Sequence, residues 1–426
     1  MPDGIASVPA GARSTADNYK WLLVGMLWLV SFFNYADRNA LAAVLPQIRA
    51  EYGMTDTELG LLSSSFLWVY AIAASPAGWL GDRFSRKAVI LAGLVAWSVV
   101  TFLTPFAGGL MSFVVLRALT GLGEASYYPA GTALIGDHHG PETRSRALAI
   151  HQTAVFAGGG IGSLIAAALA ERFDWRVPYY AYGLLGVALA AVLFWSMRDG
   201  PRAERRPAAQ TAGGRGADTL RVVLRSPSAV MLCAVFFCAT FVTAGITAWA
   251  PTFFKDVLRM SLTGATVYGA LTVNVAGFLA VLCSGALADW AVRRSRTARF
   301  SVLAAGLILA ALALLPFGLF ASAGLLGGLL LAAGFFKGLF DGSIYAAMHD
   351  VVPPEARATA VGLMTTIGFA GAGLAPLAIG AAAGPLGLGR ALAATAVLYL
   401  VAAAVLLLFR RQVARDMSRA AQPISA

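Results

Sequence analysis

Two charged side chains, Arg117 and Glu124, stand seven residues apart within the apolar stretch 113–135. On an α-helix, seven residues make nearly two turns, so both side chains lie on one face, about 10 Å apart along the axis. Charges in such a stretch are costly inside a membrane, where they face a polar cavity or an ion-pair partner. We therefore expect a polar cavity beside this segment.

A second charged pair, Asp37 and Arg38, interrupts another apolar stretch. Adjacent helical residues point about 100° apart, so we expect Asp37 to meet Arg117 across the bundle while Arg38 faces the cavity. Asp37 and Glu124 are the candidate proton-coupling groups, because water access and nearby arginines control the protonation of a carboxylate. Arg38 and Arg117 are the candidate anion-binding residues, since a guanidinium fork fits carboxylate or phosphate. The alternative is a permanent ion pair that only fixes helix packing.

A third pair, Lys337 and Asp341, is spaced four residues apart and therefore shares one helix face. It either satisfies itself or contributes substrate-binding groups to the cavity. The other candidate substrate-binding side chains are Asn34, Tyr35, Tyr127 and Asn274. For each of these four, packing or membrane-interface anchoring is the alternative.

The composition is that of a membrane protein. The 426 residues are 58% hydrophobic and 12% charged, whereas soluble domains carry about 25% charged residues. The three cysteines lie in apolar stretches without the spacing of a zinc site or a disulfide framework. The Gly-rich run 158–162 lacks the Lys-Ser/Thr of a nucleotide-binding loop. We expect no cofactor and no metal, and the absence of hydrolase and protease motifs argues against an enzyme.

Twelve continuous apolar segments are long enough to cross a bilayer, which takes about 20 residues. They predict an all-α membrane protein with twelve transmembrane helices, and continuous rather than alternating hydrophobicity argues against a β-barrel. The predicted spans are 20–44, 57–80, 87–106, 109–135, 145–170, 176–197, 228–254, 262–288, 299–321, 323–350, 357–383 and 386–410. The predicted domains are an N-terminal tail (1–19), a six-helix bundle (20–197), a flexible linker (198–227), a second six-helix bundle (228–411) and a C-terminal tail (412–426).

Most of the 32 Lys and Arg residues fall in the tails, the linker and the loops on the same side of the predicted membrane. Basic residues mark the cytoplasmic side, so both termini and the linker are expected to be cytoplasmic, in a multi-pass protein of the plasma membrane. This distribution explains the net charge of +11 without nucleic acid. The basic loops are expected to contact anionic lipid.

The two halves repeat a loop pattern. Gly, Asp and basic residues follow the second span at Gly78, Asp82, Arg83, Arg86 and Lys87, and they recur after the eighth span at Asp289 and Arg293. A second pattern runs from Asp137 to Ala147 and recurs from Asp350 to Ala360. Helix-end electrostatics would explain one such loop, but not four in register, so we infer an internal duplication.

Six plus six spans with this loop motif resemble the major facilitator superfamily. The resemblance implies two bundles that rock about a central cavity by alternating access. It also implies that the motif residues form a cytoplasmic gate, although Trp290 departs from the motif in the second copy. The segments 34–38, 123–127 and 144–147 look most like the spinster group, which is linked to export of lysophospholipids and sphingoid lipids. The same charged residues also resemble proton-coupled organic-anion symporters, which take up sugar acids.

The resulting hypothesis is a monomeric, proton-coupled secondary transporter for an amphipathic anionic or zwitterionic small molecule such as a lysophospholipid. A symporter of organic anions such as sugar acids is the alternative. A sensor that binds without transport also fits the sequence.

Overall fold

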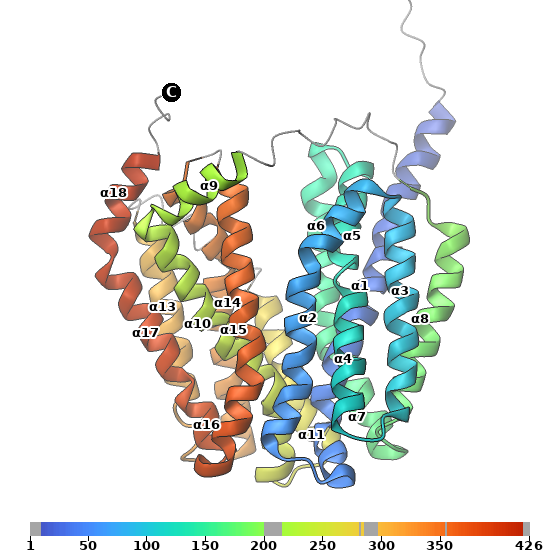
Figure 1. The fold of residues 1–426 in the computed structure, drawn as a ribbon, viewed down its shortest axis with the longest axis vertical. Helices are drawn as coiled ribbons and strands as arrows, with labels where there is room; N and C mark the ends of the chain where they lie inside the picture. The colour runs from blue at the N-terminus through green and yellow to red at the C-terminus, as the bar shows by residue number, and fades with distance from the viewer. Residues whose placement is uncertain (1–9, 200–214, 281–282, 285–296, 354–355, 421–426) are drawn as a thin grey trace, which may run out of the picture.

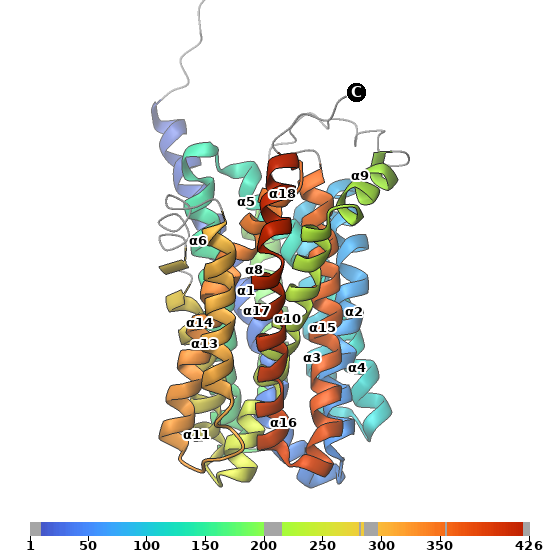
Figure 2. The same ribbon diagram turned by 90° about the vertical axis from the view of Figure 1, so that its left-hand side faces the viewer.

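The computed structural model describes residues 10–199, 215–280, 283–284, 297–353 and 356–420. Within these residues the regular secondary structure is entirely helical. Figure 1 shows two groups of helices side by side, and Figure 2 shows the C-terminal group from its outer face.

The N-terminal group contains α1 (Ala10–Tyr52), α2 (Asp56–Arg83), α3 (Arg86–Leu103), α4 (Leu110–Glu124), α5 (Tyr127–His138), α6 (Pro141–Ala157), α7 (Ser163–Arg172) and α8 (Val177–Ser196), with a 3-10 turn η1 (Thr104–Phe106) and a π-helical turn η2 (Gly158–Gly162). The C-terminal group contains α9 (Arg215–Leu224), α10 (Pro227–Thr252), α11 (Leu262–Thr266), α13 (Ala298–Leu314), α14 (Ala323–Val351), α15 (Arg357–Leu386), α16 (Leu388–Ala394), α17 (Ala396–Leu408) and α18 (Arg410–Ala420), with π-helical turns η3 (Phe253–Val257) and η4 (Val267–Leu271).

Nine helical segments in the described part of the chain are long and apolar enough to cross a membrane on their own. The predicted first, fourth and ninth spans are the ones that fall short of that standard. α13 is short, with 17 residues. α1 carries Asp37 and Arg38, and α4 carries Arg117 and Glu124. The charged residues explain the exception of α1, whereas α4, with 15 residues, and α13 fall short in length. The architecture agrees with twelve spans.

Two predicted connections contain helix. α9 forms within residues expected to be a flexible linker, and α18 forms within the expected C-terminal tail. Both are amphipathic and short, and each buries a valine, Val223 and Val413 respectively, against the C-terminal group.

The internal duplication is visible as one ion pair made twice. Arg86 at the start of α3 pairs with Asp137 near the end of α5, and Arg299 at the start of α13 pairs with Asp350 near the end of α14. Each pair joins residues 51 positions apart. Residues of the third and fourth spans therefore correspond to residues 213 positions later, as 86 does to 299 and 137 to 350.

The two groups meet most closely at the end of the molecule where α1 ends and α2 begins, which we call the far end. α1 begins and α18 ends at the opposite end, the terminal end (Figure 1). At the far end α2 packs along α15, because Gly60 lets its backbone approach the carbonyl oxygen of Pro376. A hydrogen bond from the Leu377 N–H to Ser64 Oγ (3.2 Å) joins the same two helices. These contacts join the two groups at the far end.

Candidate functional site

The centre of the N-terminal group holds a buried ion pair between Arg38 of α1 and Glu124, the last residue of α4. Nε and Nη2 of Arg38 donate to Glu124 Oε2 at 3.1 and 3.0 Å. The Glu124 side chain is fully buried, whereas that of Arg38 is 15% exposed. Asn34, one helical turn before Arg38, accepts from Nη2 at 3.3 Å through Oδ1. Arg38 therefore contacts the buried Glu124 carboxylate while part of its own side chain remains exposed.

Three aromatic rings surround the Arg38 guanidinium. Its Cζ lies 4.6 Å from the ring centres of Tyr35 and Tyr70 and 5.0 Å from that of Phe66. Such contacts stabilise a cation that is withdrawn from water. The sequence analysis included Tyr35 but missed Phe66 and Tyr70, whose spacing of four residues in α2 was the available signal.

Asp37 and Arg117 are buried beside this ion pair, but they do not form the direct pair expected from the sequence. Asp37 Oδ2 accepts from the Thr101 hydroxyl. Nη2 of Arg117 donates to the Arg38 carbonyl at 3.4 Å. The arginine still acts on Asp37 electrostatically. Within the described part of the chain, Asp37 Oδ1 and Glu124 Oε1 are buried without a hydrogen-bond partner, which leaves each carboxyl group with one unused oxygen.

In front of Arg38 a cavity lies between the two helix groups, in two adjacent lobes of about 250 Å³ each. The lobes share Arg38, Asn39, Thr243, Thr247 and Lys337. Lobe 1 adds Tyr35, Asn274, Asp341, Tyr399 and apolar side chains such as Val155, Val273, Leu314 and Leu330. Lobe 2 adds Phe66 and Arg117 from the N-terminal group and Ala372 and Pro376 of α15. The cavity is thus apolar along its walls and charged at a few points.

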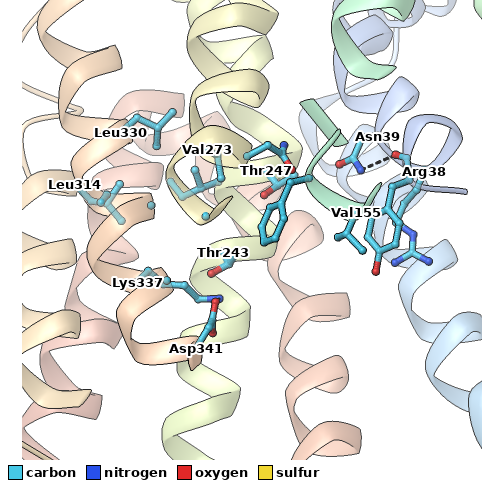
Figure 3. A pocket seen from close by; sticks show the side chains of 18 of the residues that line it. Arg38, Asn39, Val155, Thr243, Thr247, Val273, Leu314, Leu330, Lys337 and Asp341 are labelled. Carbon is cyan, nitrogen blue, oxygen red and sulfur yellow. Dashed lines mark hydrogen bonds and ion pairs between the residues drawn. The ribbon is translucent and has the colours of Figure 1, made fainter. Parts of the chain in front are cut away.

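Lys337 and Asp341 of α14 face the cavity from the C-terminal group (Figure 3). Lys337 Nζ donates to Asp341 Oδ2 at 2.6 Å. The lysine side chain is 13% exposed and the aspartate side chain 38%. The structure therefore combines the two alternatives from the sequence, since the pair satisfies itself and also lines the cavity.

The structure separates the remaining predicted contact residues. Asn274 lines lobe 1, and its side chain fills the space next to Gly159 of η2. Tyr127 instead is buried inside the N-terminal group, where its hydroxyl donates to the Leu27 carbonyl. Because that hydroxyl has only one proton, His151 must donate through Nε2 in the 2.7 Å contact between them. Tyr127 thus fixes α5 against α1 and α6, and it is not among the residues that line the two lobes.

The described residues of the predicted cytoplasmic gate lie near the terminal end. Arg86 pairs with Asp137, and Lys87 Nζ donates to the Phe194 carbonyl at 2.6 Å, so both contact their own helix group. Gly78, Asp82 and Arg83 lie in the last two turns of α2, where the side chain of Asp82 is outside the description. Asp289 and Arg293 lie outside the described residues. Their role in a gate stays a prediction.

The far end carries polar contacts between the groups that the sequence analysis did not include. Arg49 at the end of α1 bonds to Asp56 of its own group and to Asp256 of η3, with 2.8 Å between Nη1 and Oδ2. Glu171 accepts from the Thr263 N–H at 2.9 Å. The available signal was the placement of charged residues next to the ends of predicted spans, which does not identify partners from the other half.

The chain was compared with known proteins. The model of the Major Facilitator Superfamily matches residues 27–328 and 296–424. Protein spinster of Drosophila melanogaster is 28% identical over 72% of this chain and 52% of its own length. The sphingosine-1-phosphate transporter SPNS2 of Xenopus tropicalis is 28% identical over 80% of this chain and 69% of its own. The probable sulfoacetate transporter SauU of Cupriavidus necator is 28% identical over 83% and 84%. The chain thus spans about half the length of the spinster protein that it matches.

Among solved structures, a bacterial homologue of the human lysosomal transporter Spinster, in an inward-facing and unoccupied conformation, shares the fold. Its TM-score is 0.82 at 22% identity, over 93% of this chain and 98% of that one. These matches confirm the predicted fold class, the similarity to the spinster group and the expectation of a transporter rather than an enzyme. The chain is a multi-pass membrane protein that belongs to the major facilitator superfamily.

Proposed function

We propose that this protein is a proton-coupled secondary transporter that moves an amphipathic anionic or zwitterionic molecule, such as a lysophospholipid or sphingoid lipid, by alternating access. The observation that carries the proposal is the Arg38–Glu124 ion pair, whose arginine lines both lobes of the cavity while its carboxylate is buried. The apolar walls of lobe 1 suit a hydrocarbon chain. The relatives that match include a spinster protein and the sphingosine-1-phosphate transporter SPNS2.

Coupling follows from competition for one guanidinium. While Glu124 is ionised, it occupies Nε and Nη2 of Arg38. A substrate anion at Arg38 competes with that carboxylate, and protonation of Glu124 weakens the ion pair and frees the guanidinium. The anion and the proton therefore promote each other's binding, and linkage makes the effect reciprocal. The proposed cycle carries both in the same direction.

The other site residues take roles in this scheme. Asp37 is a second proton-coupling group, because Arg117 and Arg38 both attract its charge. Arg38, Arg117, Lys337 and Asp341 supply the charged substrate contacts. Around them, Tyr35 and Asn274 supply polar contacts, Asn34 holds Arg38, and Tyr127 acts only indirectly, through the packing of α5.

The proposed orientation places both termini on the cytoplasmic side of the plasma membrane, with the protein acting as a monomer. The far end then faces outward and is closed. Opening it requires release of contacts such as Arg49–Asp256. Closure of the terminal end is proposed to use the gate residues Gly78, Asp82, Arg83, Arg86, Lys87, Asp289 and Arg293.

A second candidate is proton-coupled symport of a small organic anion such as a sugar acid. The similarity to a probable sulfoacetate transporter over 83% of this chain favours it, and the cations of the cavity suit a carboxylate or sulfonate equally well. Ligand-induced thermal stabilisation separates the candidates, because a ligand that binds the native state raises its melting temperature. Stabilisation by lysolipids alone supports the first, and stabilisation by sugar acids alone supports the second.

Coupling is tested by uptake into proteoliposomes with an imposed pH gradient. We expect Glu124→Gln and Asp37→Asn each to abolish gradient-driven accumulation while exchange of labelled for unlabelled substrate persists in part. Glu142→Gln, an exposed carboxylate at the start of α6, is the matched control and should behave like the parent. Unchanged pH dependence of transport in both cavity variants would refute proton coupling through these residues.

A further inference from the structure

The Lys337–Asp341 pair stands at a special place in the duplicated fold. The repeat register of 213 positions holds at both ends of the fourth and tenth spans, since α4 begins at Leu110 and α14 at Ala323. In this register the counterpart of Glu124 is Lys337. The central position that carries the buried acid of one half therefore carries a base in the other.

The charges that reach the cavity are unequal in number. Among the described residues that line the two lobes, the cations are Arg38, Arg117 and Lys337. The single carboxylate in the same set is Asp341, because Glu124 is fully buried behind Arg38. An anionic group of a ligand thus has three partners to choose from, whereas a cationic group has one.

We propose that Asp341 binds a protonated amine of the transported molecule, so that the substrate carries an ammonium group beside its anion. This inference rests on the proposed function and narrows its substrate class to amine-bearing amphiphiles. The anionic group binds the cavity cations, and the apolar chain lies along Val273, Leu314 and Leu330 of lobe 1.

The geometry of the pair suits such an exchange. In the absence of ligand, Lys337 and Asp341 neutralise each other at 2.6 Å. A ligand with both charges replaces one ion pair by two, in which its anion meets Lys337 and its ammonium meets Asp341, so neither side chain is left unpaired. A purely anionic ligand would strand Asp341, and an unpaired charge in a partly buried site is unfavourable.

The competing explanation is that the pair only supports α14 as an ordinary i,i+4 helix pair. The two explanations predict different results when the two charges are exchanged. The double variant Lys337→Asp/Asp341→Lys keeps an ion pair on the same helix face, so a supporting role survives it. Amine recognition does not survive, because a lysine then stands at the more exposed position 341.

The experiment compares lysophosphatidylethanolamine with its N-acetylated derivative of the same acyl chain. N-acetylation removes the positive charge and keeps the phosphate and the tail. Affinities are measured at neutral pH by titrating the melting temperature of the purified protein with each lipid. We expect the parent to prefer the free amine by about 10- to 100-fold, the range of a charge-assisted hydrogen bond.

Asp341→Asn and the charge-reversed double variant are expected to bind both lipids with equal affinity. Asp341→Asn should also bind the N-acetylated lipid more tightly than the parent does, because Lys337 is released. The control is again Glu142→Gln, which should keep the preference. Preference for the amine in Asp341→Asn, or its absence in the parent, overturns the amine site and leaves the proposed function standing. Failure of the parent to bind either lipid overturns the proposed function itself.

Discussion

Replacing Gly60 by alanine is expected to open the far end of the transporter. A Cβ atom at Gly60 would overlap the Pro376 carbonyl oxygen and lie 2.9 Å from the Pro376 carbonyl carbon and from Leu377 Cα. Ordinary carbon contacts are about 3.5–4.0 Å, so α2 and α15 would have to separate by roughly 0.6–1 Å at this crossing. All three opposing atoms belong to the backbone, which cannot rotate away as a side chain can.

The substitution should destabilise only the conformation in which the far end is closed. Overpacking of this kind costs about 1–3 kcal/mol, and here the cost applies only while the far end is closed. The helix preference of alanine over glycine is the same in both conformations and cancels. A cost of about 2 kcal/mol shifts the ratio of open to closed molecules about 30-fold.

The assay is a distance measurement between spin labels on cysteines at Thr57 of α2 and Leu386 of α15, both exposed at the far end. The three native cysteines are first replaced. We expect Gly60→Ala to enlarge the long-distance population. Gly362→Ala in the same α15 is the control, because a Cβ there meets nothing within 4 Å. Identical distance distributions for the two variants would refute the idea that this close approach holds the far end closed.

Three further changes test other contacts. Arg49→Ala removes the ion pair with Asp256 and should open the far end less than Gly60→Ala does, since a partly exposed ion pair contributes less than about 1 kcal/mol. The same spin labels measure this opening, and high salt should produce a similar opening in the parent. The Arg176 hydrogen bonds lower the pKa of Glu51 below its usual 4.5. The ionised Glu51 therefore stabilises the folded protein above pH 4.5, and this stabilisation is lost as the pH falls through the lowered pKa; after solvent screening it amounts to less than about 1 kcal/mol. The melting temperature of Glu51→Gln should accordingly fall less steeply in acid than that of the parent. Asp416→Ala removes the buried carboxylate that caps the first turn of α10; it should cost about 1–3 kcal/mol, measured as a lower melting temperature and faster proteolysis of α18.

The spans and the duplicated fold could be predicted because their signals are local. An apolar stretch of about 20 residues crosses a bilayer whatever its partners are. α9 and α18 were not predicted because their helical structure depends on contacts with distant parts of the chain. Each is only ten or eleven residues long in a polar, basic stretch, and its helix depends on burying Val223 or Val413 against the C-terminal group.

The sequence predicted which charged residues lie near the cavity better than it predicted their contacts. Arg38, Arg117, Glu124 and Asp37 do gather beside one cavity, because charges in apolar helices must share a polar environment. Their pairing depends on how each helix is rotated about its own axis, which spacing along a single helix does not reveal. Arg38, not Arg117, therefore holds the glutamate, while Tyr127 packs away from the cavity.

Comparing the two halves distinguishes residues that support the fold from residues that contact the substrate. The ion pairs Arg86–Asp137 and Arg299–Asp350 join the same residue types at equivalent positions of the two halves, as expected for contacts that support the fold of each half. In the middle of the fourth and tenth spans, the same register pairs residues of opposite charge, Glu124 in one half and Lys337 in the other. A scaffold has no reason to change sign between its two copies, but a cavity that receives one asymmetric molecule from both sides does. The positions at which the halves disagree are thus the ones where substitution should alter which molecule is carried, while leaving the bundle intact.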